Sequence, residues 1–331
     1  MIKTANDQLL FILSVDAEEE FNWEGAFPQR NCSVRNIQKL PEFQQFCDSL
    51  GVHPTYLVDY PVATYDDSVK VLREIARTPN TEIGAHLHPW CNPPLEGLNT
   101  ERESHVVNLP IALVKKKITA LTEAIQQNIG VTPKVFRTGR WGITASVLKA
   151  VADAGFTIDS SIYPFYENSF FSCKKAVHTP YWPDFDDIDN AGTQRQIFEL
   201  PITAGFNRAN FKRYAKYHDF LEQPLLKPLR PIGIAWKTGL LRKHYLSPEL
   251  ASASEMRALL NAAIAEGQQT FHMYLHSSTL LQQPADHANY ALDNQLLYKR
   301  ISRCIEHLQS IADVQFVTLS EAKQRLTTQQ K

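Results

Sequence analysis

Short apolar runs alternate with amphipathic stretches along almost the whole chain. Runs rich in β-branched and aromatic side chains are typical of strands buried in a sheet, and they occupy residues 9–15, 54–58, 82–87, 134–137, 157–159, 197–202, 270–276 and 314–318. Between them, stretches compatible with helices occupy residues 36–50, 68–77, 110–128, 144–154, 254–266 and 292–311. Repeated strand–helix units predict an α/β fold with a parallel sheet, either open or closed into a barrel.

One long segment, residues 164–248, interrupts this alternation. It begins with aromatic side chains and continues, between Asn207 and Tyr245, with nine Lys or Arg against two acids. Such a basic stretch can be an ordinary solvated pair of helices, or it can bind an anionic partner such as a sugar diphosphate, an acidic saccharide or a lipid-linked intermediate at a membrane surface. We expect an insertion over the functional site, within a single domain spanning residues 1–331.

Composition narrows the class of protein. The 331 residues include 34 Lys or Arg and 35 Asp or Glu, so there is no general electrostatic reason to expect nucleic-acid binding. Five widely spaced cysteines match neither a disulfide framework nor a CxxC zinc motif, and they favour free thiols in a reducing compartment. The early apolar run is too short for a membrane span and is followed at once by acids, so a cytoplasmic location is expected.

Two histidines lie two positions apart at the end of the predicted strand 82–87 and just beyond it. Side chains at i and i+2 of a strand point to the same face, so His86 and His88 can share one ion. Two neutral imidazoles with a carboxylate suit zinc, cobalt, nickel or iron and leave positions open for water and substrate, as a hydrolytic site requires. An isolated pair of this kind more often only packs or caps locally.

The first predicted strand leads into a cluster of acids. Asp16 and Glu18 repeat the i, i+2 spacing on what we expect to be a neighbouring strand. One carboxylate can bind a metal while the other acts as a base, and a divalent cation makes their crowding tolerable. The alternative is a solvated acidic loop, which the buried strand before the acids disfavours.

Three more predicted strands end in ionisable residues, namely Arg137, Asp159 and His276. In parallel α/β folds this end of the sheet carries the functional residues. Each residue also has a structural alternative: a surface salt bridge for Arg137, a helix cap or turn for Asp159, and a buried core histidine for His276.

In their order along the chain, these segments resemble the motifs of the polysaccharide deacetylases, also called the NodB-homology or carbohydrate esterase 4 family. Residues 14–18 are similar to the first motif, 82–89 to the histidine motif, 137–142 to the arginine motif and 274–276 to the last motif. The resemblance covers residues 9–320 and implies a distorted (β/α) barrel of seven or eight strands, with the insertion before the last strands.

The resemblance also implies roles for single residues. Asp16 becomes the general base that activates metal-bound water, and His276 becomes the general acid. Glu18, His86 and His88 become the metal ligands. Zinc is the expected metal, with cobalt, nickel and iron as alternatives.

Two residues have supporting roles in the same resemblance. Arg137 would hold Asp16, and Asp159, from a segment similar to the fourth motif, would orient His276. One residue separates the two acids here, which leaves a second assignment open, with Asp16 as the direct ligand and Glu18 behind it.

The spacing of the motifs departs from the commonest family pattern. The histidines are closer together, and the arginine motif reads RTGRWG instead of RxPY. The backbone donor of the oxyanion hole near Arg140 and Trp141 is therefore left open.

The function implied by the resemblance is a metal-dependent hydrolase that removes an N-acetyl or related N-acyl group from an amino sugar in surface-polysaccharide or lipopolysaccharide metabolism. The expected substrate is a saccharide or a lipid-linked sugar, with peripheral membrane contact through residues 207–245 left open. Two alternatives remain: hydrolysis of another C–N bond, as in a sugar deformylase or a small-amide hydrolase, and a catalytically inactive carbohydrate-binding relative.

Overall fold

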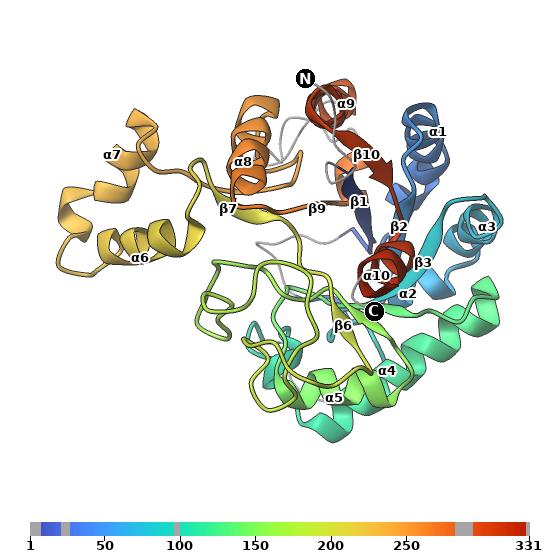
Figure 1. The fold of residues 1–331 in the computed structure, drawn as a ribbon. Helices are drawn as coiled ribbons and strands as arrows, with labels where there is room; N and C mark the ends of the chain where they lie inside the picture. The colour runs from blue at the N-terminus through green and yellow to red at the C-terminus, as the bar shows by residue number, and fades with distance from the viewer. Residues whose placement is uncertain (1–7, 21–26, 96–99, 282–293, 329–331) are drawn as a thin grey trace.

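A mostly parallel sheet curls around the centre of the molecule (Figure 1). The computed structural model describes residues 8–20, 27–95, 100–281 and 294–328. In these residues eight strands form the main sheet in the order β10-β1-β2-β3-β4-β5-β6, with β9 paired to β1. Their bounds are β1 Gln8–Ala17, β2 Pro54–Val58, β3 Glu82–Leu87, β4 Val135–Thr138, β5 Ile158–Asp159, β6 Phe198–Glu199, β9 Thr270–His276 and β10 Asp313–Phe316.

The sheet curls into a distorted barrel, in which β1 pairs with three parallel neighbours. β9 pairs with one edge of β1, while β10 pairs with the first half of the other edge and β2 with the second half. Thr203, after β6, spans the remaining gap: its N–H donates to the His272 carbonyl at 2.9 Å, and its own carbonyl accepts from Leu246 at 2.8 Å. The predicted α/β fold and distorted barrel are confirmed.

Alternate residues of each strand fill the barrel in layers, as the two-residue period of a strand requires. Leu10 and Ile12 of β1 pack in one apolar cluster with Leu57, Val135 and Ile158 of the neighbouring strands. The same cluster contains residues of the last helix, α10 (Leu319–Thr328), which packs against the apolar half of the barrel. Further along the same faces the residues become polar, so the carboxyl-terminal ends of the strands carry a buried polar layer.

Helices cover the outside of the barrel. The helices that the sequence predicted are η1 Arg35–Lys39 with α1 Leu40–Leu50, α3 Asp66–Ile75, α4 Ile111–Ala124 with the π-helical η3 Ile125–Ile129, α5 Ala145–Asp153, α8 Ala253–Ala265 and α9 Asn294–Ile311. Residues 292–293 of the last predicted helix lie outside the described part of the chain. The sequence did not predict α10, α2 Tyr60–Thr64, or the short turns η2 Val106–Asn108 and η5 Ser277–Leu280.

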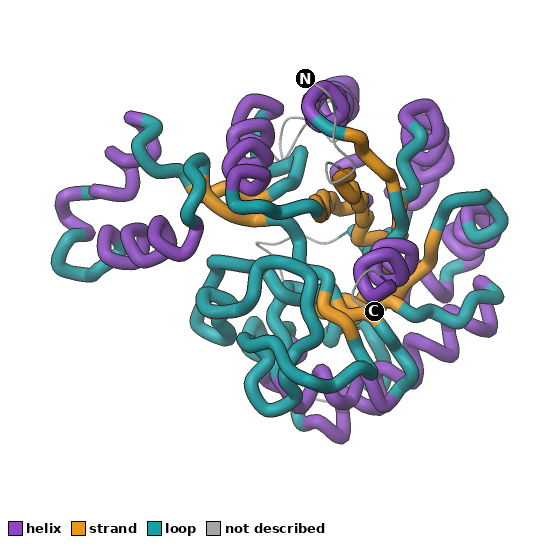
Figure 2. The backbone as a smooth tube through the Cα atoms, viewed as in Figure 1, coloured by secondary structure: helices purple, strands orange, loops and turns teal. Residues whose placement is uncertain are grey.

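The aromatic and basic range 164–248 contains several distinct parts. Its first part is nearly all loop, as Figure 2 shows, and it returns to the barrel at β6. Next, β7 (Ala204–Phe206) and β8 (Lys243–Tyr245) pair antiparallel, and between them lie α6 (Phe211–Leu221), η4 (Lys227–Leu229) and α7 (Pro231–Thr238). This α6–α7 hairpin, residues 207–242, projects from the side of the barrel (Figure 1).

The five cysteines are buried and free, as the sequence predicted for the thiols. Among the described residues, no helix combines the length and the apolar character that crossing a membrane requires.

Candidate active site

Glu18, His86 and His88 form a compact group at the carboxyl-terminal end of β1 and β3. Their side chains are almost completely buried, and one ligand atom of each lies within 4.8 Å of the others. The Nε2 atoms of His86 and His88 lie 3.4 and 3.3 Å from the same carboxylate oxygen, Oε2 of Glu18. The convergence that the i, i+2 spacing predicted is therefore present in the structure.

This group fits a divalent metal. Two ligand atoms bound about 2.1 Å from a tetrahedral metal lie about 3.4 Å apart, which is the spacing found between Glu18 and each imidazole. Nε2 of His88 is buried and has no hydrogen-bond partner among the described residues, so it is free to donate a lone pair. Burial raises the pKa of Glu18, but His276 and the nearby imidazoles of His86 and His88 outweigh this and hold the pKa well below its usual range.

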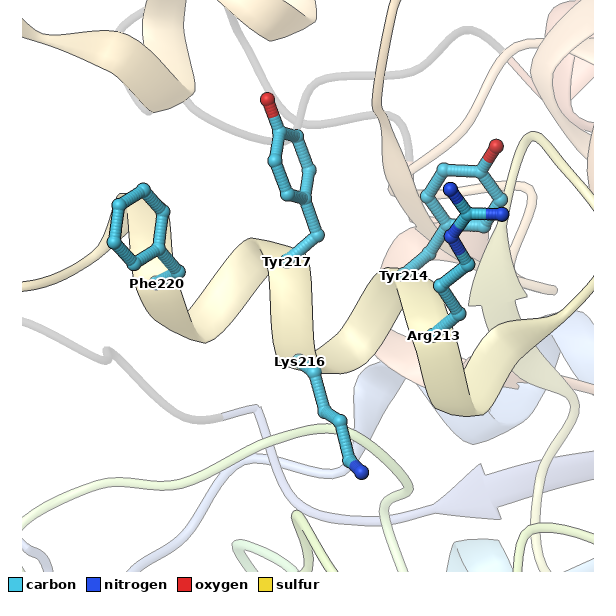
Figure 3. A pocket seen from close by; sticks show the side chains of 5 residues that line it. All are labelled: Arg213, Tyr214, Lys216, Tyr217 and Phe220. Atoms are coloured by element: carbon cyan, nitrogen blue, oxygen red, sulfur yellow. The ribbon is translucent and has the colours of Figure 1, made fainter.

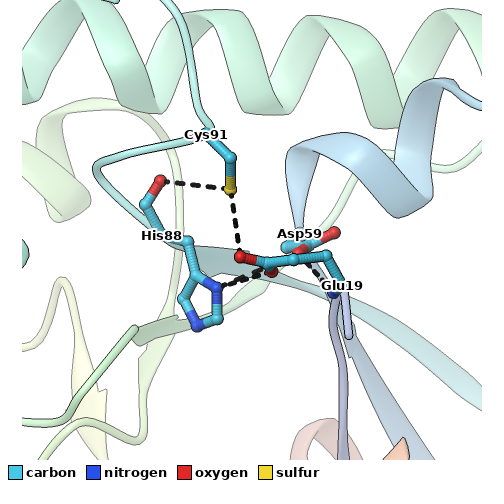
Figure 4. Close-up of side chains that lie close together, drawn as sticks. All are labelled: Glu19, Asp59, His88 and Cys91. Carbon is cyan, nitrogen blue, oxygen red and sulfur yellow. Dashed lines mark hydrogen bonds and ion pairs between the residues drawn. The ribbon is translucent and has the colours of Figure 1, made fainter. Parts of the chain in front are cut away.

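A second carboxylate, Glu19, fixes the other side of the His88 ring (Figure 4). Its Oε2 lies 2.8 Å from Nδ1 of His88, and its Oε1 accepts from Nε1 of Trp90 at 2.7 Å and from Sγ of Cys91 at 3.5 Å. Burial opposes ionisation of Glu19, yet the charge on His88 lowers the pKa of Glu19 to about 2. A carboxylate that accepts from Nδ1 presents Nε2 of the same ring to a metal.

Asp59 completes the support behind Glu19. One of its carboxyl oxygens accepts from the backbone N–H of Glu19 at 2.8 Å, and the other caps α2 by accepting from the N–H of Val62 at 2.8 Å. The strand end that carries Glu18 and Glu19 is thereby tied to the neighbouring strand end. From the sequence, Glu19 was only one member of the acidic cluster after the first strand, and no role was predicted for Asp59.

Asp16 lies beside the metal-fitting group in a different environment. Nη1 of Arg137 donates to Oδ1 of Asp16 at 2.6 Å, and both side chains are buried. The guanidinium also donates to Ser14 and to the backbone and hydroxyl of Ser160. Arg137 is therefore no surface salt bridge, and its bonds to Ser14 and Ser160 hold the guanidinium in place against the Asp16 carboxylate.

His276 faces Asp16 from β9, and Glu249 holds it there. Nε2 of His276 lies 3.9 Å from Oδ2 of Asp16, while Nδ1 lies 2.8 Å from Oε2 of Glu249. Glu249 also accepts from the backbone N–H of His276 at 2.7 Å and from the hydroxyl of Thr279. Burial lowers the pKa of His276, but Glu249, Glu18 and Asp16 together raise it to about 10.

Comparison with known proteins identifies the architecture. No protein-family model and no curated protein matches the sequence. Among solved structures, a putative polysaccharide deacetylase from Mycobacterium smegmatis is similar over 98% of this chain and 91% of its own, with a TM-score of 0.57 and 18% identity. A putative glycoside hydrolase/deacetylase from Parabacteroides distasonis is similar over 97% and 71%, with a TM-score of 0.60 and 10% identity.

The chain has the polysaccharide deacetylase fold. The two similarities cover the barrel from end to end, and they agree with the order of motifs along the sequence. At this level of identity the likeness concerns the fold, and the chemistry is argued from this chain's own residues.

Within the polysaccharide deacetylase fold, Asp159 has a different neighbour from the one expected. Its carboxyl group accepts from the hydroxyl of Ser161 at 2.8 Å and from the backbone N–H of Ser161 at 3.2 Å, and it pairs with the carboxyl group of Glu199. This agrees with the turn interpretation. Nδ1 of His276 instead contacts Glu249, which the sequence did not single out because it lies in a loop without a recognisable motif.

The arginine-motif segment has an unusual backbone next to the metal-fitting group. Arg140, Trp141 and Gly142 follow one another with φ of 60°, 61° and 76°, in the left-handed region that non-glycine residues rarely adopt. Just before them, Gly139 packs directly against the ring of His88, where a Cβ would collide with the imidazole. The segment therefore abuts a metal-fitting side chain.

Aromatic rings stand next to these residues. Trp141 stacks on Tyr163 with ring centroids 4.5 Å apart, and Tyr163 stacks on Tyr245 at 4.2 Å. The hydroxyls of Tyr163 and Tyr274 lie 2.7 Å apart, and the Tyr274 ring packs edge-on to His276. Tyr245 comes from the predicted insertion, which thus contributes to the surroundings of His276.

Proposed function

We propose that this protein is a metal-dependent hydrolase that removes an N-acetyl or related N-acyl group from an amino sugar. One observation carries the proposal. Glu18, His86 and His88 converge with metal-ligand spacing directly beside the Asp16–Arg137 and His276–Glu249 pairs. Amide hydrolysis needs a Lewis acid, a base and an acid in one place, and in this proposal a metal held by Glu18, His86 and His88, together with Asp16 and His276, would supply them.

The residues of the chain have complementary roles in this proposal. When bound, a divalent metal supplies polarisation of the amide carbonyl and lowers the pKa of water at the site. Asp16, held by Arg137, accepts a proton from the attacking water. His276 donates a proton to the leaving nitrogen, which is a poor leaving group as an anion, and Glu249 favours its protonated form at neutral pH.

The ligand assignment favours Glu18 over Asp16. Glu18 lies within 3.4 Å of both imidazole Nε2 atoms, whereas Asp16 accepts from Arg137. The donor set of two imidazoles and one carboxylate suits zinc, with cobalt, nickel and iron as the other metals of matching preference. The proposed substrate is a saccharide or a lipid-linked sugar.

An acetate-release assay tests the proposal. The purified protein is stripped with a chelator, reloaded with zinc, cobalt or nickel, and incubated with N-acetylated and N-formylated amino sugars and their oligomers. We expect metal-dependent acyl release that is lost in Asp16→Asn and His276→Ala. Stoichiometric metal binding without release from any of these substrates would instead assign the protein to the carbohydrate-binding relatives.

A further inference from the structure

The surface of the α6–α7 hairpin is unusually apolar for a solvent-facing element. Seven of the twelve large hydrophobic side chains that are exposed in the described residues lie between Tyr217 and Leu240. Leu225, Leu229 and Leu240 are 89%, 69% and 60% exposed. Only Ala235 is buried in α7, and η4 buries none of its residues, so the hairpin does not use these side chains to pack against the barrel.

The same surface carries uncompensated positive charge. Lys212, Arg213, Lys216, Lys227, Arg230 and Lys237 are all exposed, and none forms an ion pair with another described residue. The two acids of the hairpin, Asp219 and Glu222, are both paired with Lys174 outside it, at 3.0 and 3.3 Å. The hairpin therefore presents cations and apolar groups together.

Aromatic side chains also lie on this hairpin. On α6, Arg213, Tyr214, Lys216, Tyr217 and Phe220 line an open hollow of about 550 Å³, and Figure 3 shows the ring of Tyr217 and the Lys216 side chain projecting from opposite sides of the helix. On α7, Trp236 is 41% exposed. Tyr and Trp with apolar neighbours and nearby Lys and Arg are typical of helices that lie at a membrane surface.

We propose that the α6–α7 hairpin docks the protein on the surface of a bilayer that contains anionic lipids. The bilayer is the partner that offers negative headgroups directly above an apolar layer, which matches cations next to exposed leucines. A second copy of the chain would bring the same six cations against one another. A soluble acidic saccharide would match the charges but leave Leu225 and Leu229 in water.

The hairpin is connected to the candidate active site. It begins after β7 and ends at β8, whose Tyr245 stacks on Tyr163, and Glu249 follows four residues later. Arg242 and Lys243, at this junction, each donate a side-chain hydrogen bond to a backbone carbonyl, Arg242 to that of Trp236 and Lys243 to that of Phe165. They are therefore poor positions at which to test docking, and the exposed positions among residues 225–230 are better ones.

Vesicle cosedimentation of the full chain tests the proposal without any turnover, so its outcome is separate from that of the proposed hydrolase. The probes are vesicles of phosphatidylcholine alone and of phosphatidylcholine with phosphatidylglycerol. We expect preferential binding to the anionic vesicles that weakens as salt is added. Leu225→Glu/Leu229→Glu and, separately, Lys227→Glu/Arg230→Glu are expected to weaken binding by about tenfold or more.

Matched variants on α9 control for loss of apolar surface and for change of charge. Leu296→Glu/Ile311→Glu replaces two exposed apolar residues, and Lys299→Glu/Arg303→Glu reverses two exposed charges, both outside the hairpin. Both are expected to bind vesicles as the wild type does, and circular dichroism checks that each variant is folded. The proposal is overturned if the wild-type protein does not bind anionic vesicles, or if it binds neutral vesicles equally well. It is also overturned if the wild-type protein is a dimer in solution that only Leu225→Glu/Leu229→Glu disrupts, because the leucines would then contact a second copy.

Discussion

At the scale of single residues, the two acids of the first strand have separate environments that predict separate functions. Glu18 faces two imidazoles and Asp16 faces a guanidinium. Two acids that lie two positions apart in the sequence can thus have different roles, because each contacts side chains from a different strand. This distinction leads to a direct test of the ligand assignment.

We expect Glu18→Gln to lose metal and Asp16→Asn to retain it. An amide is a much weaker metal ligand than a carboxylate, whereas Asp16 is expected to act as a base, whose loss lowers the rate by about 10²–10⁴-fold. Metal content by elemental analysis, together with acetate release, separates the two variants. If Asp16→Asn were the variant that emptied the site, the two roles would have to be exchanged.

The contact between Glu249 and His276 predicts a shift in the pH dependence of activity. Burial lowers the pKa of His276, but Glu249 is the largest of the influences that raise it to about 10. As an acid, His276 works only while protonated, so activity falls as pH rises through this pKa. Glu249→Gln removes a negative charge and lowers the pKa, and the alkaline limb of the pH–rate profile is expected to move to lower pH.

The control for this experiment is Glu255→Gln on α8, a carboxylate that caps its own helix through Ser252. Its alkaline limb is expected to coincide with that of the wild type. An unchanged alkaline limb in Glu249→Gln would show that His276 is not the group whose protonation limits the reaction.

Behind the metal-fitting group, Glu19 is expected to set metal affinity. It accepts from Nδ1 of His88 and leaves Nε2 free for the metal. Removing such a partner typically costs 10- to 100-fold in metal affinity, so Glu19→Gln is expected to weaken zinc binding by about that factor. Competition with a chromogenic chelator measures it, and Glu20→Gln, at the neighbouring acid that contacts Arg35, is the matched control.

At the scale of elements, the connection after β4 shapes the site as much as the strands do. The ring of His88 packs against the backbone of Gly139, and the three residues 140–142 that follow have left-handed backbone conformations. A motif that differs from the commonest family pattern thus has a steric reason in this chain. The absence of a side chain at position 139 leaves room for the imidazole ring of His88.

Gly139→Ala is therefore expected to displace His88 and weaken metal binding more than an alanine at an open glycine would. Gly233→Ala on α7, where a Cβ meets nothing within 4 Å, is the matched control. Zinc titration by calorimetry compares the two variants. Equal zinc affinity in both would show that the His88 ring can move aside without loss.

At the scale of the whole molecule, the site joins strands that are far apart in the sequence. Glu18 directly follows β1, and His86 and His276 belong to β3 and β9, so a metal bound by Glu18 and His86 would cross-link the ends of β1 and β3. Binding that is specific to the folded state stabilises it by about 4 kcal/mol when free metal exceeds Kd by 1,000-fold. Metal should therefore raise the thermal midpoint of unfolding.

Differential scanning calorimetry with and without zinc measures this coupling. We expect a clear upward shift for the wild type and none for His86→Ala, which lacks one ligand. An equal shift in the two proteins would mean that zinc stabilises the fold at some other place.

The sequence by itself determined several barrel strands and which histidines share a face, because both follow from local periodicity. β2, β3 and β9 begin and end at the predicted residues, and His86 and His88 share a face as their spacing requires. Strand period and side-chain alternation are properties of neighbouring residues, so they can be read without knowing what lies across the sheet.

Only the tertiary structure decided which partners these residues have. Glu249 takes the place beside His276 that was expected for Asp159, and Glu19 supports His88 from a strand that is distant in sequence. Neither contact leaves a periodic signal, because it depends on which strand ends and loops the closed barrel brings together. The sequence singled out the basic residues between 207 and 245, but only the structure shows that the leucines of the α6–α7 hairpin are exposed, since a helical pattern alone does not show what covers it.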